Sequence, residues 1–85
     1  MVIIGQSFAM EMQTEKIVEI FKTSIENQYD SSLVSNVLYV MYPEAKINFD
    51  LEDCDKILRI EHSFVSIEEV TKMVKALGYQ CEVLV

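Results

Sequence analysis

The sequence has no tryptophan, one proline, two glycines, one histidine and two cysteines. With so few helix and strand breakers and a hydrophobic fraction of 51%, the chain has the composition of a compact domain with short turns. This composition excludes a disordered or low-complexity chain. Two cysteines are also too few for the disulfide framework of a small secreted domain. We therefore expect reduced thiols and a cytoplasmic location.

Basic residues are scarce as well, with seven lysines and arginines against fourteen acidic residues and a formal charge of −7. A chain of this charge repels phosphate backbones and anionic membranes, so we expect neither a nucleic-acid nor a membrane partner. No apolar run approaches the roughly 18 residues that span a bilayer. The opening stretch MVIIGQSFAMEMQ lacks the basic region of a signal peptide. Residues 1–15 are predicted to be a frayed extension, and residues 16–85 a single domain.

The last thirty residues, KILRIEHSFVSIEEVTKMVKALGYQCEVLV, carry a strong strand-helix-strand pattern. The letters SIEE form a capping box, in which the Ser66 oxygen accepts from the Glu69 N–H and the Glu69 carboxylate reaches back to the Ser66 N–H. Gly78 is predicted to end this helix. Its apolar stripe consists of four residues at helical spacing, Ile67, Val70, Val74 and Leu77.

The first half of the domain repeats the strand-helix-strand order. KIVEIFKT, residues 16–23, is apolar on both faces, which is typical of an interior strand. LVSNVLYVMY, residues 33–42, predicts a helix that ends before Pro43 and follows the capping residues Asn27, Asp30 and Ser31. Its apolar stripe comprises Leu33, Val34, Val37, Leu38 and Met41.

Between the two helices, the sequence predicts a hairpin. AKINFDL, residues 45–51, alternates apolar and polar side chains as a half-buried strand requires. The polar residues 52–55 then connect it to KILRIE, residues 56–61. We expect Asp50 to pair across this hairpin with Lys56 or Arg59.

The predicted element order is β-α-β-β-α-β. With right-handed crossovers, this order gives an α+β fold, a four-stranded antiparallel sheet of order 4-1-3-2 with two helices on one face. Such a fold is a ferredoxin-like plait. It brings three loops to one end of the sheet, and the candidate binding residues on them are Ile25, Asn27, Asp30, Cys54, Tyr79 and Cys81.

The remaining chemically reactive residues do not indicate an enzyme. His62 falls at the opposite end of the plait with no nucleophile predicted beside it, so the sequence provides no catalytic residue and implies no cofactor. The strand KILRIE carries no aromatic residue on which an RNA base could stack. We interpret the acidic hairpin residues as a solvated tip rather than a site for a hard cation; they are Asp50, Glu52, Asp53 and Asp55.

From Lys16 to Val85, and most strongly at EEVTKMVKALGYQCEVL, the chain resembles the heavy-metal-associated domains of copper chaperones and metal-transporting ATPases. The resemblance implies a loop of the pattern Met-x-Cys-x-x-Cys, whose two thiolates bind Cu(I) or Zn(II). In this chain Ile25 stands at the methionine, and Asn27 and Asp30 stand at the two cysteines. An amide and a carboxylate do not replace two thiolates for Cu(I). The resemblance therefore predicts the scaffold without its metal site.

Two functions remain open. The first is a non-enzymatic binding or regulatory module for a protein partner, which could use the sheet face that displays Lys46, Asn48, Asp50, Ile57 and Arg59. Strand four, where Cys81, Val83 and Val85 alternate with Glu82 and Leu84, could instead pair with a second copy in a homodimer.

The alternative is a divergent metal-handling protein, a Cu(I) or Zn(II) chaperone or sensor that uses Cys54 and Cys81. Sheet spacing places these two residues about 10 Å apart. That separation is too long for a direct disulfide, whose Cα atoms usually lie within about 7 Å.

Overall fold

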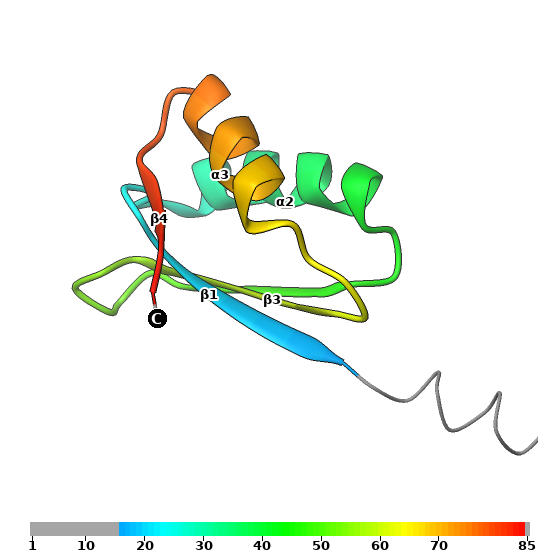
Figure 1. Ribbon diagram of the computed structural model, residues 1–85. Helices are drawn as coiled ribbons and strands as arrows, with labels where there is room; N and C mark the ends of the chain where they lie inside the picture. The colour runs from blue at the N-terminus through cyan, green and yellow to red at the C-terminus, as the bar shows by residue number, and fades with distance from the viewer. Residues whose placement is uncertain (1–15, 85) are drawn as a thin grey trace, which may run out of the picture.

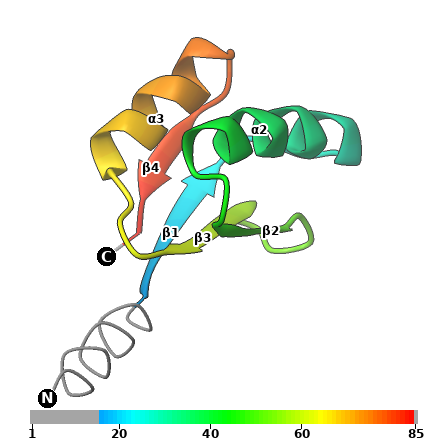
Figure 2. The same ribbon diagram turned by 90° about the vertical axis from the view of Figure 1, so that its right-hand side faces the viewer.

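The computed structural model describes residues 16–84 and shows one antiparallel sheet covered on one side by two helices (Figures 1 and 2). In chain order the elements are β1 (Ile17–Thr23), α2 (Gln28–Met41), β2 (Lys46–Asp50), β3 (Ile57–His62), α3 (Ile67–Ala76) and β4 (Cys81–Val83). The strand order is β2-β3-β1-β4. The predicted ferredoxin-like plait is therefore confirmed. The predicted extension, residues 1–15, lies outside the described residues.

β1 is an inner strand, as its apolar sequence predicts. It pairs with β3 on one side and β4 on the other, and the register places Phe21 between Leu58 and Val83. Phe21 is fully buried beneath the helices, whereas Val18 is 41% exposed. The helices thus cover only one of the two apolar faces of β1.

Neither helix in residues 16–84 has the length and hydrophobicity of a membrane-spanning segment.

α2 begins at Gln28, well before the predicted start at Leu33, because Asn27 acts as its N-cap. The Asn27 Oδ1 atom accepts a hydrogen bond of 2.8 Å from the Asp30 N–H. The longer helix presents a narrower stripe to the sheet than the sequence predicts. Val34 and Leu38 are fully buried, but Leu33 is 39% exposed, so the buried part of the predicted stripe does not include Leu33.

The capping box of α3 forms only in part. The Ser66 Oγ atom accepts from the Glu69 N–H at 3.2 Å, as predicted. The Ser66 N–H, however, donates to the Tyr42 hydroxyl at 3.0 Å and not to the Glu69 carboxylate. Tyr42 follows α2 directly and is 7% exposed. This hydrogen bond therefore ties the end of α2 to the start of α3. Gly78, with a φ of 103°, follows α3 as predicted.

The hairpin between β2 and β3 turns through a left-handed residue. Lys56 has a φ of 48°, and its N–H donates to the Asp53 carbonyl at 3.0 Å. Lys56 therefore belongs to the turn, and β3 begins at Ile57.

The expected ion pair of Asp50 with Lys56 or Arg59 is wrong. The register places Asp50 opposite Ile57. Arg59 pairs instead with Glu61 at 3.8 Å, and the Lys56 Nζ atom donates to a backbone carbonyl at 2.9 Å.

We predict that Tyr42→Phe lowers the free energy of unfolding by about 1 kcal/mol, because it leaves the part-buried Ser66 N–H without its acceptor. Urea unfolding followed by circular dichroism measures the change. Tyr39→Phe is the matched control, because Tyr39 lies in the last turn of α2, three residues before Tyr42, and is 41% exposed. Equal unfolding midpoints for the two variants would contradict the assigned role of Tyr42.

Candidate functional site

Three loops meet at one end of the sheet, as the plait predicts (Figure 1). The Thr23 N–H lies 3.1 Å from the Asp55 carbonyl and 3.2 Å from the Lys56 carbonyl, which joins the end of β1 to the hairpin. Ser24 and Gln80 exchange two hydrogen bonds, which join the β1–α2 loop to the α3–β4 turn. The backbone therefore fixes the positions of these loops.

Thr23 anchors the first of these loops. Its Oγ1 atom donates to the Lys56 carbonyl at 2.7 Å and accepts from the Ile25 N–H at 3.1 Å. The side chain of Thr23 is almost fully buried, and Ile25 is completely buried. Ile25 is therefore anchored in the core, and its predicted place at a binding site stays a prediction.

Asn27, Asp30 and Tyr79 come together at the N-terminus of α2. The Asn27 Nδ2 atom donates to the Asp30 Oδ2 atom at 3.1 Å. A hydrogen bond to Asp30 raises the pKa of the Tyr79 hydroxyl, and partial burial and the negative charge of Asp30 raise it further. A carboxylate in the first turn of a helix also interacts favourably with the helix dipole. Asn27 and Asp30 thus belong to a hydrogen-bonded helix cap.

Cys81 lies inside the core rather than on an open edge. It is 4% exposed. Burial raises the pKa of its thiol, against the opposing effects of a hydrogen bond with Thr71 and the positive charge of Lys75. The raised pKa keeps the thiol protonated, and a thiol is a poorer metal ligand and nucleophile than a thiolate.

Cys54 is exposed at the tip of the hairpin, and both cysteines are free. Ligand atoms of Asp53, Cys54 and Asp55 lie within 4.8 Å of one another. Cys81 is not part of that group. Among the described residues, Cys54 is thus grouped with two hard carboxylates and without a second thiol. His62 lies at the opposite end of β3, with its ring centroid 5.4 Å from that of Tyr42.

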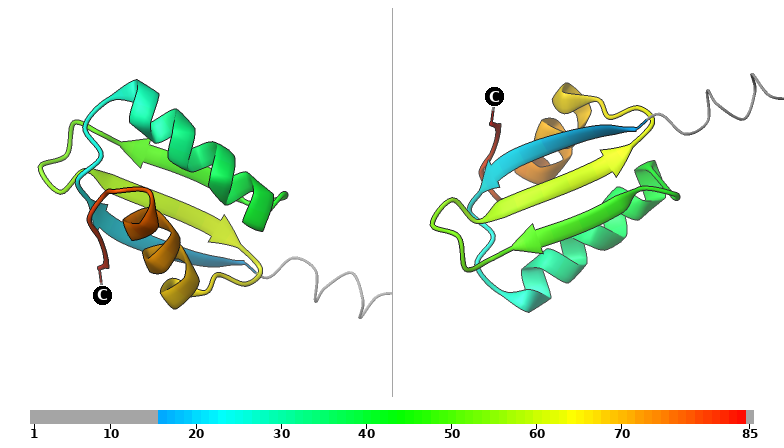
Figure 3. Two further views of the ribbon diagram at one scale, coloured as in Figure 1. Left: turned by 90° about the horizontal axis from the view of Figure 1, so that it is seen from above. Right: turned by 90° about the horizontal axis from the view of Figure 1, so that it is seen from below.

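The face of the sheet opposite the helices is uncovered by any described element, as the view from below in Figure 3 shows. Five side chains predicted for this face are exposed or half-buried and alternate with neighbours that face the helices; they are Lys46, Asn48, Asp50, Ile57 and Arg59. Sequence reasoning missed three apolar residues on the same face, Val18, Ile20 and Leu84. The sequence contains a signal for such a surface, because β1 is apolar on both faces. We had interpreted both faces as belonging to the interior of the protein.

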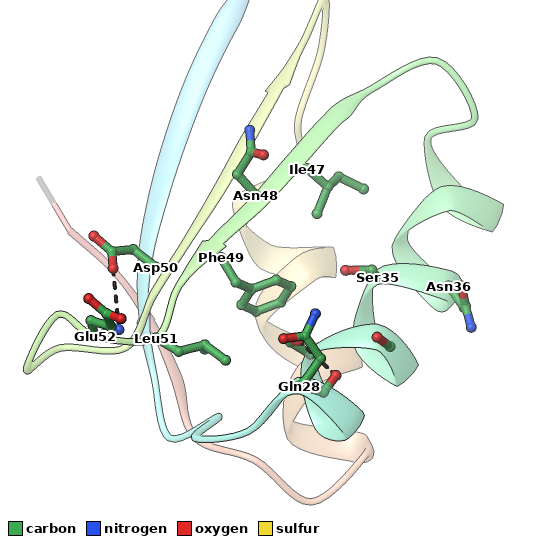
Figure 4. Close-up of a pocket in the computed structure, with 11 residues that line it drawn as sticks. Gln28, Ser35, Asn36, Ile47, Asn48, Phe49, Asp50, Leu51 and Glu52 are labelled. Atoms are coloured by element: carbon green, nitrogen blue, oxygen red, sulfur yellow. Dashed lines mark hydrogen bonds between the residues drawn. The ribbon is translucent and has the colours of Figure 1, made fainter.

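Two grooves run along the edges of the sheet. The groove beside β2 has a volume of about 520 Å³ and is lined by Gln28, Ser31, Ser32, Ser35, Asn36 and residues 47–52 (Figure 4). The groove beside β4 has a volume of about 510 Å³ and is lined by Lys22, Thr23, Thr71, Lys75 and residues 80–83. The β2 groove was not predicted, because it depends on how α2 crosses the sheet.

Comparisons with family models, with curated proteins and with solved structures each found no match for this chain. The geometry of the described residues is therefore the basis for proposing a function.

The two thiols should differ sharply in reactivity. At pH 8 we expect a disulfide reagent to label Cys54 rapidly and Cys81 only after unfolding, because the thiolate is the reactive form and burial raises the pKa of Cys81. Time-resolved labelling with and without urea measures this, and Cys54→Ser is the control. Rapid labelling of two thiols in the folded protein would contradict the burial of Cys81.

The same pKa shift predicts a pH dependence of stability. The unfolded chain loses the Cys81 proton at a lower pH than the folded chain, so the folded state binds more protons above about pH 8.5. The free energy of unfolding should therefore fall as the pH rises through that value. Cys81→Ala should reduce this fall.

Proposed function

We propose that this protein is a non-enzymatic binding or regulatory module that docks a protein partner on the uncovered face of its sheet. We further propose that its scaffold is that of a heavy-metal-associated domain in which a helix cap replaces the thiolate site. The observation that carries the binding role is the group of apolar side chains left open on the sheet.

These apolar side chains lie side by side on neighbouring strands. Val18 is 41% and Leu84 is 38% exposed. The Leu84 N–H donates to the Ile20 carbonyl at 2.8 Å, so Leu84 continues the sheet beside β1. An exposed apolar group of this kind is typical of an interaction surface in a small protein.

Charged side chains surround this apolar group. The strand register places Glu61 opposite Val18, Arg59 opposite Ile20, and Glu82 opposite Lys22. An apolar centre within a charged rim is the usual anatomy of a protein interface. Both signs of charge are present, which favours a protein partner over a nucleic acid.

A second copy of the chain is one such partner, through strand addition at β4. β4 pairs only with β1, so its outer edge is open among the described residues. Its edge is less apolar than the sequence predicts, because Cys81 is buried. Sedimentation equilibrium measures self-association, and a Val83→Pro variant should abolish a dimer formed at this edge.

Site-specific photo-cross-linking tests the sheet face. A benzophenone side chain at Val18 should give a discrete cross-linked partner in cells of the native host, because Val18 lies within the proposed interface. The same group at Lys72, on the exposed side of α3, is the control and should give none. Arg59→Glu should remove the cross-link. Equal yields from both positions would contradict the proposed surface.

The proposed scaffold makes a gain-of-function prediction. The head groups of Asn27 and Asp30 already lie 3.1 Å apart, so two thiolates at these positions would reach one soft ion. The double variant Asn27→Cys with Asp30→Cys should bind one Zn(II) per chain in a competition assay with a chromophoric chelator. Each single variant is a control. If the double variant binds zinc no better than the single variants, the scaffold proposal fails.

Metal handling through Cys54 and Cys81 is the competing proposal. The group of ligand atoms around Cys54 contains Asp53 and Asp55 but not Cys81, so it offers a soft ion one thiol only. Titration of the reduced protein with Cu(I) and Zn(II) separates the two functions. We expect no stoichiometric sub-micromolar binding, because Cys81 is buried and protonated. Tight binding lost in both Cys54→Ser and Cys81→Ser would establish the metal-handling function instead.

A further inference from the structure

The groove beside β2 is roofed by a helix. In both views of Figure 3, the N-terminal half of α2 extends beyond the edge of β2. Figure 4 shows Ile47, Phe49 and Leu51 pointing toward α2, while Gln28 and Ser35 point from α2 toward the strand. The groove therefore has an apolar floor, a polar wall and a volume of about 520 Å³.

β2 borders this groove with an open backbone edge. It pairs with β3 and, among residues 16–84, with no other strand. The outward N–H and C=O groups of an edge strand are a template for another strand. An extended chain laid against β2 would continue the sheet and pass beneath α2.

We propose that this groove binds an extended segment of a partner protein, which adds an antiparallel strand to β2 and places lysine or arginine side chains beside Asp50 and Glu52. The inference rests on the proposed binding function and gives it a second surface with a defined partner chemistry. In strand addition of this kind, main-chain hydrogen bonds provide the affinity, and contacts of alternate side chains provide the specificity.

The negative charge at one end of the groove indicates where the bound segment should carry basic side chains. Asp50 and Glu52 belong to the lining, which contains no lysine or arginine. None of the ion pairs between residues 16 and 84 involves either carboxylate. Residues 1–15 contain no lysine or arginine that could supply the missing charge. A basic side chain from the partner would therefore meet two carboxylates without competing against an internal cation.

The pleat of β2 defines the rest of the pattern. Ile47 and Phe49 face α2, while Lys46, Asn48 and Asp50 lie on the opposite face. An antiparallel partner strand should thus place apolar side chains opposite Ile47 and Phe49. It should place polar side chains opposite Lys46, Asn48 and Asp50. Opposite Lys46 the favoured side chain is acidic, and opposite Asp50 it is basic.

Two other occupants fit less well. A second copy that paired through its own β2 would be related by a two-fold axis perpendicular to the sheet, and both overhanging α2 helices would then occupy the same space (Figure 3). Residues 1–15 of the chain carry Glu11 and Glu15 and no basic side chain, so they do not match the acidic rim.

The probe is the blocked synthetic peptide Lys-Thr-Lys-Val-Thr-Val-Glu, titrated into the ¹⁵N-labelled full-length protein and followed by NMR. In the antiparallel register, its second lysine lies opposite Asp50 and its glutamate opposite Lys46. The control peptide Lys-Thr-Glu-Val-Thr-Val-Lys has the same composition with both of these pairs reversed. We expect the probe to bind about tenfold more tightly than the control, with shift changes at Asn48, Phe49 and Ser32.

Matched variants test separately the negative charge of Asp50 and the open volume of the groove. Asp50→Asn should weaken binding of the probe by about two- to fivefold, while Glu82→Gln, on the same face of the opposite edge strand, should leave it unchanged. Ser32→Trp should fill the groove and abolish binding, whereas Ala76→Trp on the exposed end of α3 should not. The ¹⁵N spectrum of each variant verifies its fold.

Three results would overturn the inference. They are equal affinity for the two peptides, shift changes confined to β4, and nuclear Overhauser effects between residues 1–15 and Phe49 in the free protein. In each case, cross-linking through Val18 could still succeed, because that experiment reads the sheet face and not the groove. Failure of the cross-linking experiment alone would overturn the proposed function while leaving a measured peptide affinity in place.

Discussion

The handedness of two crossover connections determines how this small chain distributes its apolar residues. α2 links β1 to β2 with β3 between them, and α3 links β3 to β4 with β1 between them. A right-handed crossover is strongly preferred for such connections, and two of them place both helices on the same face of the sheet. The result is one core, one uncovered sheet face and two open edges.

The covered face buries the side chains that stabilise the fold. Phe21, Leu58, Ile60, Val70 and Val74 are all at or near zero exposure. In a domain of 85 residues the margin of stability is small, so apolar side chains left outside the core are a cost to the isolated protein. Val18, Ile20 and Leu84 are such residues. A partner that covers them offsets this cost, which is the physical basis for the proposed interface.

Local signals in the sequence were sufficient for most of the fold. The alternation in KINFD placed β2, the Ser66 side chain capped α3, and Gly78 followed that helix. Each of these features depends on residues within a few positions of one another. The order of elements then restricted the sheet to one arrangement through the crossover rule.

Features that depend on distant residues were not predictable. The Ser66 N–H binds Tyr42, which lies 24 positions earlier, and no local pattern indicates that contact. Asn27 is the cap of α2 among the three candidates, and the position of the loop before it depends on the contact between Thr23 and Ile25. The groove beside β2 depends on the direction in which α2 crosses the sheet. The sequence therefore indicated which loops would meet, but not the hydrogen bonds through which Thr23 joins them.

Solvent paramagnetic relaxation of methyl groups in the free protein tests the uncovered sheet face most directly. A soluble paramagnetic probe should strongly broaden the methyl signals of Val18, Ile20 and Leu84 and leave those of Val34, Val70 and Val74 sharp. The first three lie on the open face, and the other three belong to the buried core. Protection of Val18 and Ile20 at low protein concentration would contradict an open face and remove the basis for the proposed interface.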